Sequence, residues 1–245
     1  MRAAAPIFFL PALACLAMAL IGCNREPYSR SGTGFSALDK KVLYDFRNLP
    51  PAPPAIDETT KAKVISAAMH VASVPNCRPE SSAQIGGSAD GSFTAAGLKQ
   101  AVYLVEVGRC EREAEPVRRL VVFTAGAFTA KADVTWPDAI LGTFDLNADH
   151  KNELLLGGGR VDQGQVIRIA KLVVFDKDRL ATVEDFGQIY DDTCGTTLAA
   201  KSMTASVVYD LPPPPNQKPR FTVELYRAEC PVQGRPPRWE RVSGR

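Results

Sequence analysis

The stretch Asp145-Leu-Asn-Ala-Asp-His-Lys-Asn-Glu153, followed directly by Leu-Leu-Leu-Gly-Gly-Gly (154–159), carries the clearest information about the fold. Oxygen-bearing side chains alternate with spacers along the first part, and a short apolar run begins where the polar part ends. A short apolar run next to turn residues is typical of a buried strand. The stretch therefore predicts a polar loop attached to a rigid β-sheet.

The spacing within this acidic loop (residues 145–153) suits a hard cation. Calcium takes about six to eight oxygen ligands, and a tight loop supplies them only when ligands alternate with spacers. The first, third, fifth, seventh and ninth places offer the side chains of Asp145, Asn147 and Asp149, the backbone carbonyl of Lys151 and the side chain of Glu153. Two other interpretations are a metal-free polar turn and a catalytic pair of carboxylates. A glycosidase pair must flank a substrate bond, whereas these groups converge on one point.

The acidic loop resembles the D-x-[DN]-x-[DN]-G-x-x-[DE]-L loop of FG-GAP and VCBS-type repeats. The resemblance implies β-propeller blades that hold a structural calcium ion between two strands, and it carries over the five ligands named above and no other residue. The sixth place, glycine at positive φ in that family, is His150 here. Histidine tolerates positive φ better than β-branched residues do. Weak binding, with a dissociation constant of about 0.1 to 1 mM, is therefore expected.

Outside the loop, the sequence predicts one β-rich domain over residues 57–245 with a single N-terminal helix over 57–74. Apolar residues recur at helical spacing from Val64 to Ala72, and Pro75 ends the pattern. The strand-like runs are 101–107, 117–123, 153–159, 165–175, 203–209 and 221–225. The expected class is mainly β, with antiparallel hairpins or propeller-blade-like sheets.

A related pair of phrases lies within these runs. Residues 119–123 read RLVVF and residues 171–175 read KLVVF. Repetition at such an interval is what propeller blades produce. Coincidence between two valine-rich strands explains the pair equally well.

The N-terminus indicates export and a lipid anchor. Arg2 precedes an uncharged apolar stretch that ends in Leu20-Ile21-Gly22-Cys23, and this pattern is typical of a signal peptide, here residues 1–22. The ending resembles the lipobox of bacterial lipoproteins, which implies cleavage before Cys23 and lipidation of that cysteine, including an acyl chain such as palmitate. Two or more chains anchor a protein durably. An uncleaved membrane anchor is the alternative.

The same resemblance predicts the location. We expect the protein in the cell envelope, with the domain in the periplasm or at the surface, and Asn24 favours the outer over the inner membrane. Residues 23–56 are predicted to form a lipidated, flexible, proline-rich tether. The VLYDF run at 42–46 is the part of this tether that could dock onto the domain.

Four further cysteines agree with export. Cys77, Cys110, Cys194 and Cys230 suggest two disulfides in an oxidising compartment, and they can pair in three ways. The first two close the predicted helix and the first strand, and the last two flank the C-terminal hairpin. We therefore favour the pairs 77–110 and 194–230.

The charge balance and the motifs make several classes of function unexpected. Loss of residues 1–22 removes one basic residue, so the 29 basic residues become 28 against 27 acidic ones, and such a balance gives no basic face for nucleic acid. The chain has two histidines and no G-x-S-x-G motif. We therefore expect no enzyme, but a lipid-anchored envelope protein whose calcium-stabilised domain is a binding or scaffolding module for an envelope protein or a glycan. The alternative is an envelope hydrolase that acts on glycan or peptide through Asp and Glu residues.

Overall fold

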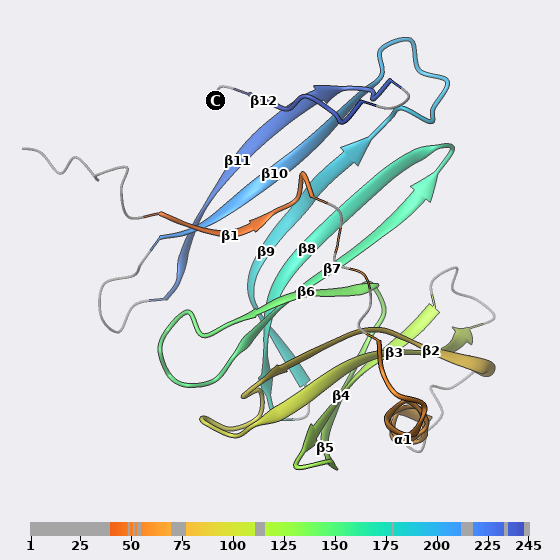
Figure 1. The fold of residues 1–245 in the computed structure, drawn as a ribbon, viewed down its shortest axis with the longest axis vertical. Coiled ribbons are helices and arrows are strands. Elements are labelled where there is room, and N and C mark those ends of the chain that lie inside the picture. Colours follow the sequence, from red (N-terminus) through yellow and green to blue (C-terminus); the bar gives the residue numbers. More distant parts are fainter. Residues whose placement is uncertain are drawn as a thin grey trace, which may run out of the picture. The chain divides into compact units, whose positions relative to one another are not determined.

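The computed structural model describes residues 40–48, 50, 52, 55–69, 77–110, 116–177, 179–211, 218–232 and 235–242. These residues belong to one compact unit, Ala37–Arg245. They form two antiparallel sheets and one helix (Figure 1), which confirms the predicted mainly β class. The predicted signal peptide and the predicted lipidation site, Cys23, lie outside the described residues.

The elements in chain order have the following bounds: β1 (Lys41–Asp45), α1 (Glu58–Met69), β2 (Cys77–Gly91), β3 (Gln100–Cys110), β4 (Pro116–Thr124), β5 (Ala127–Val134), β6 (Ala139–Phe144), β7 (Glu153–Asp162), β8 (Gln165–Asp176), β9 (Arg179–Asp192), β10 (Ser202–Leu211), β11 (Arg220–Glu229) and β12 (Glu240–Arg241). Among the described residues, no helix is both long and apolar enough to cross a membrane.

The smaller sheet has the order β2-β3-β4-β5, and α1 packs against one of its faces. Its central pair, β3 and β4, confirms the predicted hairpin. The helix begins after Asp57, whose Oδ1 accepts a hydrogen bond from the Thr60 amide at 2.9 Å, as a helix cap should. It ends at Met69, and the remainder of the predicted helix, residues 70–74, lies outside the described residues.

The larger sheet has the order β12-β11-β10-β9-β8-β7-β6, with β1 added along β10, and it curls into a half-barrel. Strand β9 pairs with β10 only at Met203–Ala205. Beyond that point β1 pairs with β10, from Val207 to Asp210. The opening between β9 and β10 is thus where β1 joins the sheet.

Strand β1 lies within the predicted tether, so the domain begins before residue 57. Its N-terminal neighbour Lys40 forms an ion pair of 2.6 Å with Glu224 on β11, which is only 8% exposed. The VLYDF run therefore docks onto the domain, because the pairing of β1 with β10 and this ion pair both hold it.

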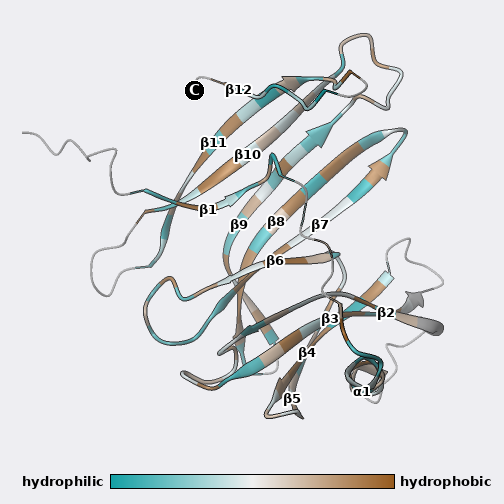
Figure 2. Ribbon diagram, viewed as in Figure 1, coloured by the Kyte–Doolittle hydropathy of each residue, from teal (hydrophilic) through white to brown (hydrophobic). Residues whose placement is uncertain are grey.

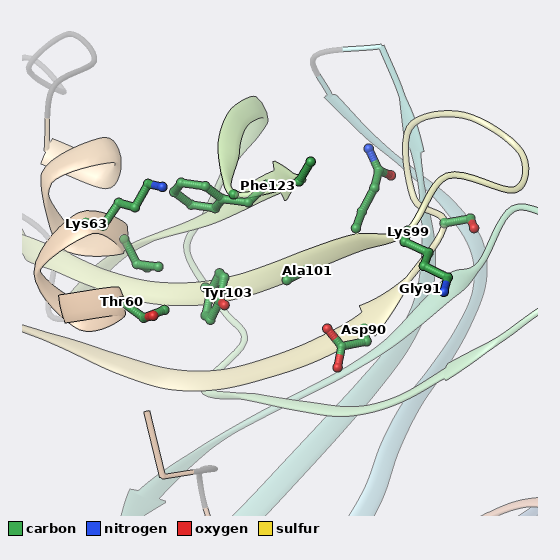
Figure 3. A pocket seen from close by; sticks show the side chains of 13 residues that line it. Thr60, Lys63, Asp90, Gly91, Lys99, Ala101, Tyr103 and Phe123 are labelled. Carbon is green, nitrogen blue, oxygen red and sulfur yellow. The ribbon is translucent and has the colours of Figure 1, made fainter. Parts of the chain in front are cut away.

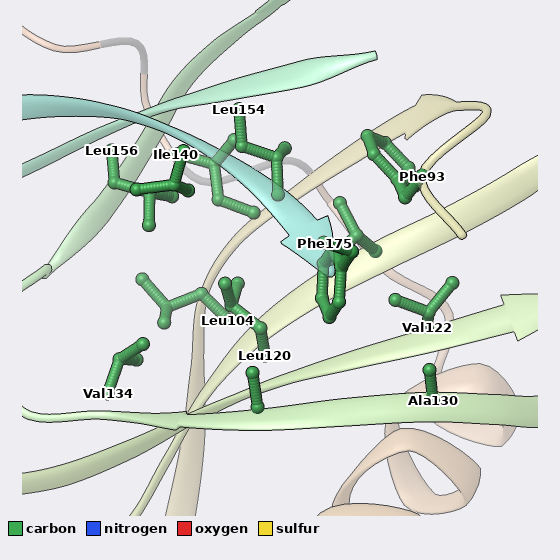
Figure 4. Close-up of a cluster of buried hydrophobic side chains, with 13 residues drawn as sticks. Phe93, Leu104, Leu120, Val122, Ala130, Val134, Ile140, Leu154, Leu156 and Phe175 are labelled. Carbon is green, nitrogen blue, oxygen red and sulfur yellow. The ribbon is translucent and has the colours of Figure 1, made fainter. Parts of the chain in front are cut away.

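The main core lies between the two sheets and takes one face of each. Leu154 and Leu156 point into it, whereas Leu155 points to the second core inside the curled sheet. Such burial on both faces explains the unbroken apolar run of β7. Phe175 and Leu104 both belong to the main core and come from opposite sheets (Figure 4). Strands β8 to β11 show mixed apolar and polar residues instead (Figure 2).

The two LVVF phrases fall on β4 and β8, which belong to different sheets of four and eight strands. The described residues therefore give no support to the propeller-blade-like arrangement or to a VCBS/FG-GAP repeat. Similar local sequence arises here because both strands are buried centrally in their own sheets.

Cys194 and Cys230 form a disulfide across the open end of the β10–β11 hairpin, as predicted. Backbone register places Cys77 opposite Cys110 on β2 and β3. Their side chains lie outside the described part of the structure, so the 77–110 bridge stays a prediction.

Candidate functional site

The acidic loop connects β6 to β7, and Glu153 is the first residue of β7. His150 has φ 64°, the left-handed conformation expected for the sixth place of the FG-GAP and VCBS-type loops that this loop resembles. Ala148 also has positive φ, at 57°, which the backbone preference of alanine does not predict. The backbone therefore turns within the loop as the spacing predicts.

Three of the predicted ligands hold the turns of the loop itself. The His150 amide donates to Asp145 Oδ2 at 3.2 Å. The Asp149 amide donates to Asn147 Oδ1 at 3.1 Å, and the Lys151 amide donates to Asp149 Oδ1 at 2.7 Å. Short polar side chains that accept from nearby amides in this way stabilise turns without any ion.

Glu153, in contrast, is buried, with 4% of its surface exposed. Its Oε2 accepts a hydrogen bond of 3.1 Å from the Leu146 amide. Burial raises the pKa of the Glu153 carboxyl, and the negative charges of Asp149 and Asp145 raise it further. The inner end of the loop is therefore a place where a cation would relieve electrostatic cost.

The loop fits calcium in its ligand types, its backbone turn and its electrostatics. In this conformation, however, no three His, Cys, Asp or Glu side chains of the described residues gather closely enough to hold a metal ion. Coordination would require the oxygens of Asn147 and Asp149, which accept hydrogen bonds within the loop, to move closer to those of Asp145 and Glu153. Calcium binding thus stays a prediction.

The acidic loop is bound to the connection between β2 and β3, residues 92–99. The Ser92 amide donates to Asn152 Oδ1, and the Asn152 amide donates to the Ser92 carbonyl, each at 2.7 Å. The Gly97 amide donates to the carbonyl of His150 at 3.0 Å. A Cβ at Gly91 would stand only 2.8 Å from Asn152 Oδ1, so a larger residue there would displace the Asn152 side chain. In the sequence, Asn152 is only a spacer, and nothing marks it as a contact residue.

The β2–β3 connection forms one wall of a pocket of about 690 Å³. The other walls of this pocket are α1 and the turn after β4. We call it the α1 pocket (Figure 3). Tyr103 and Phe123 line it, with ring centroids 5.9 Å apart in an edge-to-face arrangement. Lys63, Lys99 and Asp90 add charge around these rings.

The charges of the α1 pocket are available to a ligand. Lys63 Nζ lies 5.9 Å from the centre of the Phe123 ring. No ion pair joins Lys63, Lys99 or Asp90 to another of the residues described. Pockets of this volume with an aromatic lining and a few polar groups are the usual form of ligand sites.

Buried polar contacts fix the wall beside these groups. Gln100 is 4% exposed, and its Oε1 accepts from the amides of Phe93 and Thr94 at 2.7 and 2.9 Å. Its Nε2 donates to Thr124 Oγ1 at 2.9 Å, across to β4. The β2–β3 connection is thus held by Gln100 from inside and by the acidic loop from outside.

In comparisons with known proteins, no family model, no curated protein and no solved structure matches this chain.

Proposed function

We propose that this protein is a lipid-anchored protein of the cell envelope and that its β-rich domain is a binding module. The lipobox-like residues 20–23 support attachment to the membrane through lipid at Cys23. The Cys194–Cys230 disulfide supports an oxidising compartment, because disulfides are rare in the reducing cytosol. The outer membrane, with the domain in the periplasm or at the surface, is the location that Asn24 favours.

One observation carries the binding proposal: the predicted cation loop is hydrogen-bonded to a wall of the α1 pocket. Asn152 and His150 hold Ser92 and Gly97 through three hydrogen bonds. Ser92 itself lines the pocket. A calcium ion that orders the loop would therefore order the pocket wall as well, since ligand binding is tighter when a wall is preorganised.

The chemistry of the α1 pocket suits a polar partner. Tyr103 and Phe123 offer faces and edges against which a sugar ring or an aliphatic stem packs, while the ammonium groups of Lys63 and Lys99 and the carboxylate of Asp90 bind hydroxyl or charged groups. An envelope glycan, or a polar segment of an envelope protein, has these groups.

Calcium binding is tested by thermal unfolding of the full chain in chelator and in about 5 mM calcium. With a dissociation constant of about 0.1 to 1 mM, this concentration stabilises the fold by about 1 to 2.3 kcal/mol. The midpoint should rise by several degrees, and Asp149→Ala should abolish the rise. Asp162→Ala, which removes an exposed carboxylate at the end of β7, is the matched control. An unchanged midpoint in the native protein would leave only the metal-free turn.

The anchor is tested separately, through the distribution of the protein between membrane and soluble fractions of the envelope. The native protein should sediment with membranes, and Cys23→Ser should release it or leave its precursor uncleaved. Incorporation of an alkyne-labelled fatty acid should disappear in the same variant. A native protein that takes up no label would contradict the lipid anchor, whatever the outcome with calcium.

A further inference from the structure

A second pocket, of about 440 Å³, lies on the larger sheet where β1 and the turn after it meet β8 and β9. We call it the β1 pocket. It shares no lining residue with the α1 pocket. Phe46, Leu141, Ile189 and Met203 make much of its wall apolar. Its volume falls within the range of about 300 to 1,000 Å³ that is usual for small-ligand sites.

Two opposite charges face this pocket from neighbouring strands. In the register of β8 and β9, Arg168 stands opposite Tyr190 and Val166 stands opposite Asp192. Arg168 and Asp192 are therefore diagonal neighbours on one face of the sheet, where such positions are about 7 to 8 Å apart. Both line the pocket, yet no ion pair joins them.

Each charged group keeps capacity for a ligand. Arg168 forms an ion pair with Asp138, with 2.9 Å between Nη2 and Oδ1. A guanidinium has five N–H donors, so others remain for a ligand. Asp192 Oδ1 accepts a hydrogen bond of 2.8 Å from the Cys194 amide, and Oδ2 accepts a longer one of 3.5 Å from the Tyr190 hydroxyl. A carboxylate has about four acceptor sites, so acceptor capacity remains for a ligand. The remaining guanidinium donors of Arg168 and the carboxylate of Asp192 both border the pocket.

Tyr190 stands between the two charges. Burial and then the Asp192 carboxylate raise the pKa of its hydroxyl to about 12, while Arg168 acts in the opposite direction. The hydroxyl therefore stays protonated, and both charged groups influence its pKa. Arg47, which also lines the pocket, is occupied elsewhere: it donates to both oxygens of Asp45 at 2.9 and 2.7 Å.

We propose that the β1 pocket binds a free amino acid with an apolar or aromatic side chain. Its carboxylate would bind Arg168, its ammonium group would bind Asp192, and its side chain would pack against Phe46, Leu141 and Met203. A purely apolar ligand would desolvate both charged groups without contacting either, whereas a zwitterion contacts both. This ligand is independent of the partner proposed for the α1 pocket.

The test is isothermal titration of the full chain with L-phenylalanine and two analogues that each lack one charge. Phenylalaninamide lacks the carboxylate, and N-acetylphenylalanine lacks the ammonium group. Phenylalanine should bind at least about tenfold more tightly than either analogue, and Arg168→Gln should abolish only its advantage over the amide. Asp192→Asn, which keeps an acceptor for the Cys194 amide, should abolish only its advantage over the acetylated analogue.

Two controls keep these outcomes interpretable. Arg179→Gln removes an exposed arginine of β9 that pairs with Asp176 outside the pocket, and it should bind like the native protein. Thermal unfolding should show that every variant is folded. No detectable binding of phenylalanine to the folded native protein, or equal binding of all three compounds, overturns the proposal.

Discussion

Calcium should slow hydrogen exchange at two backbone amides that lie outside the acidic loop. The amides of Ser92 and Gly97 donate to Asn152 Oδ1 and to the His150 carbonyl, at 2.7 and 3.0 Å. Each can exchange only after the contact between the β2–β3 connection and the acidic loop opens. If the contact can open only after calcium has left the loop, bound calcium lowers the fraction of molecules in which it is open. Exchange at both amides then slows.

The size of the effect follows from linkage. Protection rises by a factor of one plus the ratio of calcium concentration to dissociation constant. For about 5 mM calcium and a dissociation constant of about 0.1 to 1 mM, this factor is about 6 to 50. Asn152→Ala removes the acceptor for Ser92, which costs about 1 kcal/mol and lowers its protection about fivefold even without calcium.

The assay is amide exchange measured by NMR, with and without calcium. The amide of Arg47, which donates to Asp45 Oδ1 in another part of the domain, is the internal control and should respond only to global stability. In Asn152→Ala, calcium should still raise the unfolding midpoint, but its effect on the Ser92 amide should largely disappear. A calcium-dependent midpoint with unchanged exchange at Ser92 and Gly97 in the native protein would refute the coupling between loop and pocket.

Three further predictions concern stability. Because burial and the neighbouring Asp149 and Asp145 raise the pKa of Glu153, this carboxyl contributes stability below its unfolded pKa and loses that contribution as pH rises through its folded pKa. In chelator, Glu153→Gln should therefore have a larger free energy of unfolding than the native protein at pH 7, and this difference should disappear below about pH 4. Urea titrations at several pH values measure it, and a difference that does not vary with pH would contradict this. Arg119 is 3% exposed and joins Asp133 on β5 to the Ala68 carbonyl of α1, so Arg119→Ala should lower the unfolding free energy by about 2 to 3 kcal/mol. The exposed Arg179→Ala should change it little, and equal losses in the two would count against a special contribution of Arg119. The Cys194–Cys230 disulfide spans a separation of 36 residues, so Cys194→Ser/Cys230→Ser should lose about 4 kcal/mol on the loop-entropy estimate. The urea curves of the native protein and the variant should coincide once both are reduced, and a difference that persists would contradict this.

Local patterns were sufficient for much of the fold. Alternating apolar residues predicted the β10–β11 hairpin, and cysteines at its ends predicted their disulfide. The position of His150 within the loop spacing predicted its positive φ. Each of these features depends on residues that are close along the chain, where side-chain period and turn geometry determine conformation.

Other elements could not be predicted from local pattern. Strand β2 contains the segment SAQIGGSADG, which is rich in residues that disfavour strands, and it is a strand because β3 pairs with it. Strand β1 lies in a stretch that resembles a linker, and it is ordered by pairing with β10. In both cases tertiary contacts override weak intrinsic preference.

The sequence by itself determined a mainly β protein with a polar loop of calcium-type spacing and a lipoprotein-like N-terminus. Only the tertiary structure decided what that loop touches and where ligands can enter. Asn152 and Ser92 are 60 residues apart in the chain, and Arg168 and Asp192 share a pocket because β8 and β9 pair in one register. Periodicity encodes which face of a strand is buried, whereas contacts between distant segments arise only when sheets pack and the chain curls.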